Sequence, residues 1–172
     1  MELEIKSFDA IENNECRILI LGTMPGNDSL KTNQYYAHED NLFWDVIFRV
    51  CDKNWKCDEL VDRDYETKKR LLLTNKIALW DVLKSCNRKG SLDKTIRNAA
   101  HNDFKSFFKK HPEIKQVFFN GKKAQEYFDD FKNETEIFTG RTFTLLPSTS
   151  PSNTMNSFYV LKEWMRIRNY IS

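Results

Sequence analysis

Four short hydrophobic runs, each bounded by turn-forming residues, divide the chain at roughly regular intervals. They cover residues 17–21, 77–80, 116–119 and 142–146 and are rich in Ile, Leu, Val and Phe, with little alternation of polar positions. Strands that are buried on both faces of a parallel sheet have this pattern. We therefore predict four parallel strands at these positions.

Helical periodicity fills the segments between the predicted strands. Phe43, Trp44, Ile47, Phe48 and Cys51 follow the spacing of one helix face. Because strands alternate with helices, the pattern predicts an α/β fold, a three-layer α/β/α arrangement around a central four-stranded parallel sheet. A loop is expected at 85–92. The remaining predicted helices cover 65–73, 101–110, 121–131 and 153–170.

The length and composition fit a single domain over residues 1–172. Hydrophobic residues make up 40% and charged residues 30% of the chain, as in ordinary globular proteins. The first fifteen residues are too acidic for a signal peptide, and no hydrophobic run approaches the roughly 20 residues of a membrane span. We therefore expect a cytoplasmic protein with no membrane contact, or a nuclear one if the cell has a nucleus.

Charge and cysteine content add little by themselves. The net charge is +2, and the basic residues of the C-terminal third can be read as a solvated surface or as a nucleic-acid contact. The four cysteines are irregularly spaced and form no CxxC pair, which predicts four free thiols and no metal site. The cysteines are Cys16, Cys51, Cys57 and Cys86.

Three predicted strand ends carry candidate chemistry. Gly22-Thr-Met-Pro-Gly26 follows the first strand, Asn120 ends the third, and a hydroxyl-rich segment at 147–153 follows the fourth. In open parallel sheets, ligands bind at the carboxyl ends of the strands. Each feature also has a structural reading: an ordinary Gly/Pro turn, a helix N-cap, and a well-capped loop.

The four motifs occur in a fixed order. Gly-x-Met-Pro-Gly is followed by Tyr-Tyr-Ala-His-x-x-Asn-x-Phe-Trp at 35–44, then by Phe-Asn-Gly at 119–121 and Leu-Pro-Ser-Thr-Ser-Pro at 146–151. This series resembles the uracil-DNA glycosylase superfamily. Within it, the resemblance is greatest to the hypoxanthine-DNA (deoxyinosine) glycosylases. The resemblance implies a uracil-DNA glycosylase-like fold and an enzyme that flips a deaminated base out of DNA and hydrolyses its N-glycosidic bond.

The resemblance also implies roles for individual residues. Asn41 is expected to orient the attacking water and Tyr36 to stack on the flipped base. His38 is expected either to contact the base or a phosphate or to bond to backbone, and Asn120 to read the base edge. The base-binding set is completed by Gly22, Thr23 and Met24. The expected DNA contacts are Lys122, Pro147, Ser148, Thr149, Ser150, Pro151, Ser152 and Asn153.

Two positions depart from related enzymes. Met24 stands where mismatch-specific relatives carry a water-binding Asn, and Leu146 stands where the common uracil enzymes carry His. The Leu146 replacement argues against efficient uracil excision but not against purine excision, and both replacements motivate a non-catalytic alternative. They leave open a uracil or mismatch glycosylase, a non-catalytic DNA-binding module, or a nucleoside-hydrolysing enzyme of similar fold. We expect a monofunctional, cofactor-free, metal-free monomer whose partner is DNA containing a deaminated base.

Overall fold

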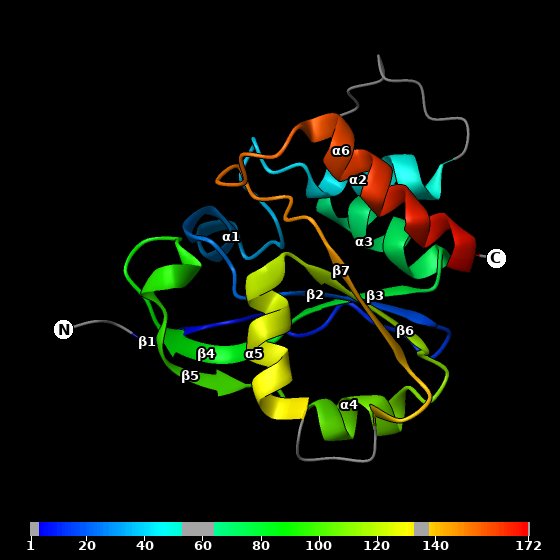
Figure 1. The fold of residues 1–172 in the computed structure, drawn as a ribbon, viewed down its shortest axis with the longest axis horizontal. Coiled ribbons are helices and arrows are strands. Elements are labelled where there is room, and N and C mark those ends of the chain that lie inside the picture. The colour runs from blue at the N-terminus through cyan, green and yellow to red at the C-terminus, as the bar shows by residue number, and fades with distance from the viewer. Residues whose placement is uncertain (1–3, 53–63, 133–137, 172) are drawn as a thin grey trace.

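A computed structural model describes residues 4–52, 64–132 and 138–171 of the chain. Its central sheet has four parallel strands in the order β3-β2-β6-β7, as Figure 1 shows. The four predicted parallel strands are therefore confirmed. Their bounds are β2 (Ile18–Gly22), β3 (Ile77–Asp81), β6 (Gln116–Asn120) and β7 (Thr142–Leu146).

A second, smaller sheet was not predicted. It has the order β1-β4-β5 and is antiparallel, with strands β1 (Glu4–Lys6), β4 (Leu83–Asn87) and β5 (Arg97–His101). The predicted loop at 85–92 is therefore wrong over its first three residues, which belong to β4. The predicted helix start at His101 is also wrong, because His101 ends β5. These strands are short and polar, so they lack the hydrophobic run that marks a doubly buried strand.

Helices connect and cover the sheets. The predicted helices near 43, 65, 101 and 121 are present with shifted ends, whereas the last one begins four residues later than predicted, after an Asn156 cap. A short helix after Gly26 was not predicted. The helices are α1 (Asn27–Thr32), α2 (Phe43–Cys51), α3 (Tyr65–Thr74), α4 (Phe104–Lys110), α5 (Lys122–Lys132) and α6 (Ser157–Trp164), which a 3₁₀ helix (Met165–Tyr170) follows.

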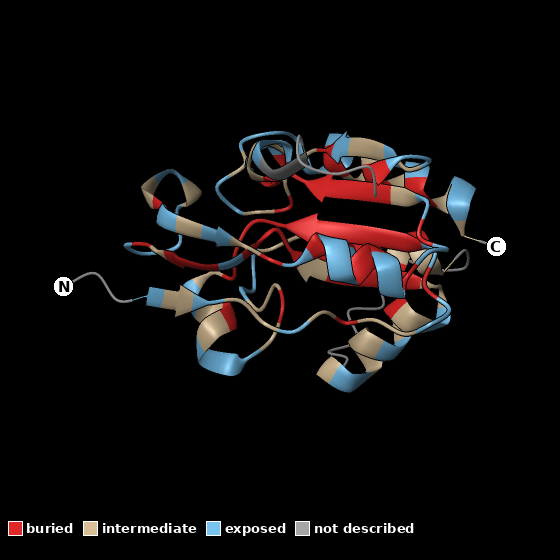
Figure 2. Ribbon diagram, turned by 90° about the horizontal axis from the view of Figure 1, so that it is seen from below, coloured by how far each residue is buried: buried red, intermediate tan, exposed pale blue. Residues whose placement is uncertain are grey.

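The central sheet separates two hydrophobic cores. Along β2, Ile18 and Ile20 pack with α2, α3 and α6, whereas Leu19 and Leu21 pack with α4 and α5. Successive side chains of a strand point to opposite faces, so a continuous hydrophobic run supplies both cores. Figure 2 shows the buried strands between less buried helices. The three-layer α/β/α prediction is confirmed.

Phenylalanine dominates the core beneath α4 and α5. The Phe128 ring lies 5.0 Å from Phe104, 5.2 Å from Phe119 and 5.4 Å from Phe143, measured between centroids. Burying one such side chain stabilises the fold by roughly 1.5–3 kcal/mol. This cluster anchors α4 and α5 to the sheet and fixes where α5 begins, next to the strand ends.

The order of the strands places a crevice at the carboxyl edge of the central sheet. The chain moves from β2 outward to β3 and then returns to the other side of β2 to form β6. Ligands bind at such a switch point, beyond the strand ends. Gly22, Asp81 and Asn120 end β2, β3 and β6 at this edge.

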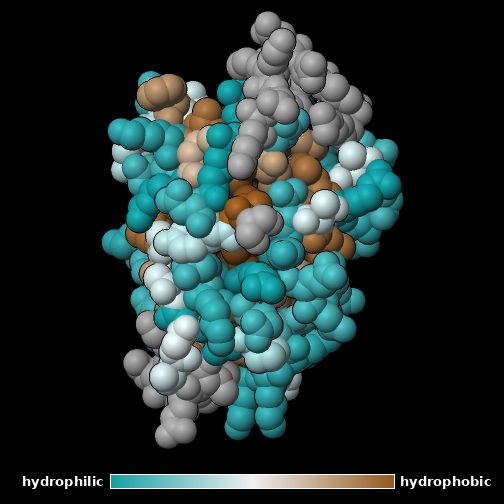
Figure 3. Space-filling view, turned by 90° about the vertical axis from the view of Figure 1, so that its right-hand side faces the viewer, coloured by the Kyte–Doolittle hydropathy of each residue, from teal (hydrophilic) through white to brown (hydrophobic). Residues whose placement is uncertain are grey.

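Hydrophilic side chains predominate on the face drawn in Figure 3, where hydrophobic atoms appear as interrupted patches. Among the helices that the structure describes, none has the length and apolarity needed to cross a membrane.

Candidate active site

A cavity of about 420 Å³ opens at the carboxyl edge of the central sheet. Its volume lies within the range of small-molecule binding pockets. The walls come from segments that are far apart in the sequence: the turn after β2, the segment before α2, the ends of β3 and β6, and loops at 91–94 and 148–152. The predicted site residues that line it are Gly22, Thr23, Met24, Tyr36, His38, Asn41, Asn120, Lys122, Ser148, Ser150, Pro151 and Ser152.

Tyr36 forms the aromatic part of the cavity wall. Its ring stacks on Phe43, with centroids 3.9 Å apart and planes inclined by 18°. The backbone of Tyr36 has φ 54°, a left-handed conformation that costs about 1–3 kcal/mol for a residue with a side chain. Its hydroxyl is buried without a hydrogen-bond partner among the described residues. Burial raises the pKa of Tyr36, so the hydroxyl stays protonated.

Gly22 allows three segments to meet at the base of the cavity. A Cβ atom at this position would lie 2.5 Å from Asp81 Oδ1 and 2.6 Å from the Tyr36 hydroxyl oxygen. Real Cβ atoms do not approach other atoms this closely. The missing side chain of Gly22 is therefore what lets these two oxygen atoms converge at the end of β2.

Asp81 was missed by the sequence analysis. It is 3% exposed and lines the cavity, and its Oδ2 accepts a hydrogen bond of 2.7 Å from Ser7 Oγ. Burial raises the pKa of this carboxyl to about 7, with Asp93 adding to the rise and Ser7 and Arg88 opposing it. A signal was available, because Asp81 directly follows a hydrophobic run, just as Asn120 does.

Asn41 lies just before α2 and lines the cavity. Its Oδ1 accepts a hydrogen bond of 3.0 Å from the backbone N–H of Phe43. The next backbone N–H, that of Leu42, donates to the Thr149 carbonyl at 3.0 Å. Asn41 therefore has a capping role and is held close to the loop after β7. The second lone pair of Oδ1 and the side-chain NH₂ remain available to a ligand as far as the described residues show.

His38 is an exposed residue on the rim of the cavity. Its Nδ1 accepts a hydrogen bond of 3.1 Å from the Asp40 backbone N–H. Its Nε2 lies 3.9 Å from Asp28 Oδ2. One ring nitrogen therefore bonds to backbone, and the other faces the rim, so both roles considered from the sequence are compatible with this placement.

Asn120 and Thr149 form a reciprocal pair across the strand ends. Asn120 Nδ2 donates to Thr149 Oγ1 at 2.8 Å, and the Thr149 N–H donates to Asn120 Oδ1 at 2.9 Å. Thr149 is fully buried. In contrast to the phosphate contact expected for it, the Thr149 side chain fixes the Asn120 amide. Thr149 leaves one proton and one lone pair of that amide unused.

In the rest of the loop at 147–153, some residues hold the loop in place and others face the cavity. Asn153 Nδ2 donates to the Ser148 carbonyl at 2.6 Å, and Trp164 Nε1 donates to the Pro147 carbonyl at 2.8 Å. Pro147 and Asn153 therefore hold the loop in place. The residues that it presents to the cavity are Ser148, Ser150, Pro151 and Ser152.

The loop after β4, which the sequence analysis did not assign to the site, forms another part of the cavity wall. Buried Arg88 donates to the carbonyls of Pro25 and Gly90 and lies 3.8 Å from Asp93 Oδ1. Ser91 Oγ accepts a hydrogen bond of 2.9 Å from the Asn27 N–H at the start of α1. The loop is thereby tied to the turn after β2. Three lysines, Lys94, Lys122 and Lys123, also line the cavity, together with Asp28, Asp81 and Asp93.

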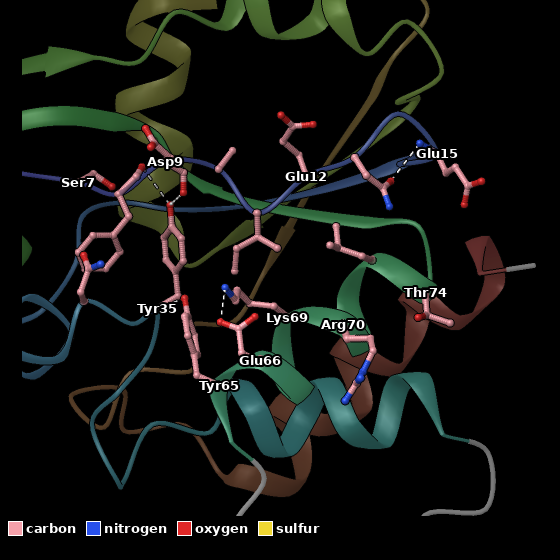
Figure 4. A pocket seen from close by; sticks show the side chains of 16 residues that line it. Ser7, Asp9, Glu12, Glu15, Tyr35, Tyr65, Glu66, Lys69, Arg70 and Thr74 are labelled. Atoms are coloured by element: carbon pink, nitrogen blue, oxygen red, sulfur yellow. Dashed lines mark hydrogen bonds and ion pairs between the residues drawn. The ribbon is translucent and has the colours of Figure 1, made fainter.

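A larger cavity of about 970 Å³ lies elsewhere, between residues 7–15 and α3 (Figure 4). Acids and bases are mixed around it, and Lys69 pairs with Glu66 at 2.6 Å. The residues around it include none of the predicted site residues. We therefore take the smaller cavity at the sheet edge as the candidate active site.

The described cysteines and acids do not assemble into a metal-binding group. Within residues 4–52, 64–132 and 138–171, no three His, Cys, Asp or Glu side chains come together. Cys16, Cys51 and Cys86 are free thiols in the described structure. Cys57 lies outside the described residues.

Comparison with known proteins gives consistent results. The family model described as "Uracil DNA glycosylase superfamily" matches residues 8–168. A hypoxanthine DNA glycosylase of Methanosarcina acetivorans is 34% identical over 159 residues, which cover 92% of this chain and 94% of that protein. A Methanosarcina barkeri protein of the same name is 35% identical, covering 71% of this chain and 74% of that protein.

The fold also matches a solved structure. The solution structure of a putative uracil DNA glycosylase from Methanosarcina acetivorans superimposes with a TM-score of 0.80. The two chains are 32% identical, and the superposition covers 98% of each.

Proposed function

Because the chain belongs to the uracil-DNA glycosylase superfamily and is a DNA N-glycosylase, we propose that it releases hypoxanthine from deoxyinosine in DNA. Two relatives that are 34% and 35% identical carry the name hypoxanthine DNA glycosylase. The observation that favours a purine is the position of Leu146, which is fully buried in the core. No imidazole at that position is available to stabilise a departing uracil anion.

The proposed reaction begins when the damaged nucleotide leaves the helix and enters the 420 Å³ cavity. The base stacks on Tyr36, a contact worth about 1–3 kcal/mol. Asn120 hydrogen-bonds the O6 and N1–H edge of hypoxanthine through the amide atoms that Thr149 leaves unused.

Asn41 then positions the water that attacks C1′. The deoxyribose passes through an oxocarbenium-like state, as in other glycoside hydrolysis, so the water needs orientation more than activation. The hydrogen bond from the Phe43 N–H holds the side-chain amide of Asn41 in one position in the cavity. The products are free hypoxanthine and an abasic site.

Residues around the mouth bind the DNA backbone in this proposal. Ser148, Ser150 and Ser152 offer hydroxyl groups, and Lys122 and Lys123 offer positive charge. Pro151 presses toward the gap that the flipped base leaves. We propose that residues 1–172 work as one domain and as a monomer.

Single-turnover excision on matched duplexes tests the substrate. Each duplex carries one deoxyinosine, deoxyuridine or deoxyxanthosine, and alkaline cleavage reveals abasic sites. We expect release mainly from deoxyinosine. Faster release from deoxyuridine would show that uracil is the preferred base. Activity on free deoxyinosine equal to that on the duplex would indicate a nucleoside hydrolase.

An Asn41→Ala variant tests the catalytic assignment. We expect excision to fall by two or more orders of magnitude, with duplex binding retained, because Asn41 positions water and does not hold the DNA. Asn14→Ala is the matched control, since Asn14 is exposed and lies outside both cavities. An Asn41→Ala enzyme as fast as the control would overturn the role of Asn41.

A further inference from the structure

The candidate active site contains an acid that the motifs do not account for. Asp81 Oδ1 and the Tyr36 hydroxyl oxygen lie 2.5 Å and 2.6 Å from the position that a Cβ on Gly22 would occupy. Both residues line the cavity, and Asp81 is 3% exposed. A buried carboxyl thus lines the pocket, and it and the residue proposed to stack on the base both approach Gly22.

Hydrolysis of a deoxyinosine bond requires help for the departing base. As the C1′–N9 bond breaks, its electron pair moves into the purine ring, and protonation of the base removes the developing negative charge. The position that carries imidazole in common uracil enzymes is occupied here by the fully buried Leu146. Any protein group that protonates the base must therefore be another of the residues that line the cavity.

The surroundings of Asp81 favour its protonated form and orient its proton. Ser7 Oγ donates to Oδ2 at 2.7 Å, so the carboxyl proton is placed on Oδ1, which faces Gly22. Burial is the main reason that the pKa of the carboxyl is raised to about 7, and Asp93 contributes to this rise. Arg88 and the Ser7 hydroxyl oppose the rise. The Tyr36 hydroxyl remains protonated and does not compete for this proton.

We propose that Asp81 is the general acid that protonates the departing hypoxanthine. This inference rests on the proposed function. The proton passes from Asp81 Oδ1 to a ring nitrogen of the base while the C1′–N9 electron pair moves to the base. The water oxygen held by Asn41 bonds to C1′ and loses a proton to solvent, and solvent returns a proton to Asp81. The products are neutral hypoxanthine and the abasic sugar.

Ser7 provides a test that does not touch the base pocket. Its side chain reaches Asp81 from the larger cavity, where Figure 4 labels it, and it does not line the smaller one. Its hydrogen bond favours the ionised carboxylate. A Ser7→Ala substitution therefore raises the pKa of Asp81 and extends the pH range in which the acid holds its proton.

The experiment measures single-turnover excision from a deoxyinosine duplex between pH 5.5 and 9 for wild type, D81N and S7A. We expect the wild-type rate to fall as pH rises through an inflection near neutrality. D81N is expected to lose about 10²–10⁴-fold at low pH and to show no such inflection. S7A is expected to remain active at low pH and to move the inflection to higher pH.

Two controls test whether the D81N and S7A proteins are folded. The first is thermal unfolding, and the second is binding to a duplex that carries a non-hydrolysable 2′-fluoro-deoxyinosine. A level wild-type profile, a D81N rate equal to wild type, or an S7A inflection at the wild-type pH would each overturn the role of Asp81. If wild type releases a base other than hypoxanthine, the substrate proposal fails separately. The same pH series on the base that is released then tests Asp81.

Discussion

At the scale of single residues, Gly22 sets the geometry of the active site. Its missing side chain leaves room for Asp81 Oδ1 and the Tyr36 hydroxyl, which would lie 2.5 Å and 2.6 Å from an added Cβ. Two functional side chains therefore depend on the absence of one methyl group. Gly26, in the same turn, is less constrained, because the nearest atom to its added Cβ is Ser91 Oγ at 3.5 Å.

A Gly22→Ala substitution is expected to slow excision about 10²-fold, because it displaces Asp81 and Tyr36 from their positions. Overpacking of this kind also costs about 1–3 kcal/mol of stability. Single-turnover excision and urea unfolding measure the two effects. Gly26→Ala serves as the control and is expected to stay close to wild type. Equal rates for the two variants would contradict the constraint at Gly22.

At the scale of structural elements, the loop after β4 is held by a buried arginine. Arg88 donates to the Pro25 and Gly90 carbonyls and pairs with Asp93 at 3.8 Å. Because the Arg88 side chain is buried, losing it removes the donor to the Pro25 and Gly90 carbonyls and the positive charge beside Asp93. This side chain therefore connects the loop after β4 to the turn after β2.

An Arg88→Met substitution is expected to lower the free energy of unfolding by about 1–3 kcal/mol, the usual cost of leaving a buried hydrogen-bonding group without its partner. Urea unfolding of Arg88→Met and of the exposed neighbour Lys89→Met measures the difference. The Lys89→Met protein is expected to match wild type. A loss below 1 kcal/mol in Arg88→Met would show that the loop is held by other contacts.

At the scale of the whole molecule, one buried group links stability to pH. The pKa of Asp81 is about 7 in the folded protein and close to 3.8 when exposed. The folded state therefore favours the protonated acid. The stabilisation from keeping Asp81 neutral is complete below pH 3.8 and is lost as pH rises toward 7.

We expect D81N to remove this dependence, since an amide does not titrate. Between pH 5 and pH 8, the free energy of unfolding of D81N should rise relative to that of wild type by about 2–3 kcal/mol. Urea unfolding at the two pH values measures it without any activity assay. A constant difference between the two proteins would mean that Asp81 is ionised throughout this range.

The distribution of charge over the whole molecule predicts how DNA binding responds to salt. Lys122 lies at the mouth of the cavity, and each lysine–phosphate contact releases counterions. Lys122→Ala is expected to reduce the slope of log affinity against log salt by about 0.9. Lys115 precedes β6, at the opposite edge of the sheet, so Lys115→Ala should keep the wild-type slope. Fluorescence anisotropy at several salt concentrations measures both, and equal slopes would place the DNA elsewhere.

Sequence patterns were sufficient to predict the central sheet and most of the segments that line the cavity. Hydrophobic runs and helical spacing are local properties, so they located β2, β3, β6 and β7 and the helices on both faces. The motifs around Gly22, Asn41 and Asn120 follow strands or precede helices, and in a parallel sheet such positions meet at one edge. This is why the sequence could bring together residues that are far apart in the chain.

Which side chains face the cavity, and whether they are protonated there, depends on packing between distant parts of the chain. Thr149 turns inward onto Asn120, and Asp81 is drawn into the site by packing against Gly22 and Ser7. The β1-β4-β5 sheet was also missed, because its polar strands are stabilised by pairing with one another. Burial and the resulting pKa arise from contacts between residues far apart in the chain, and no local pattern encodes them.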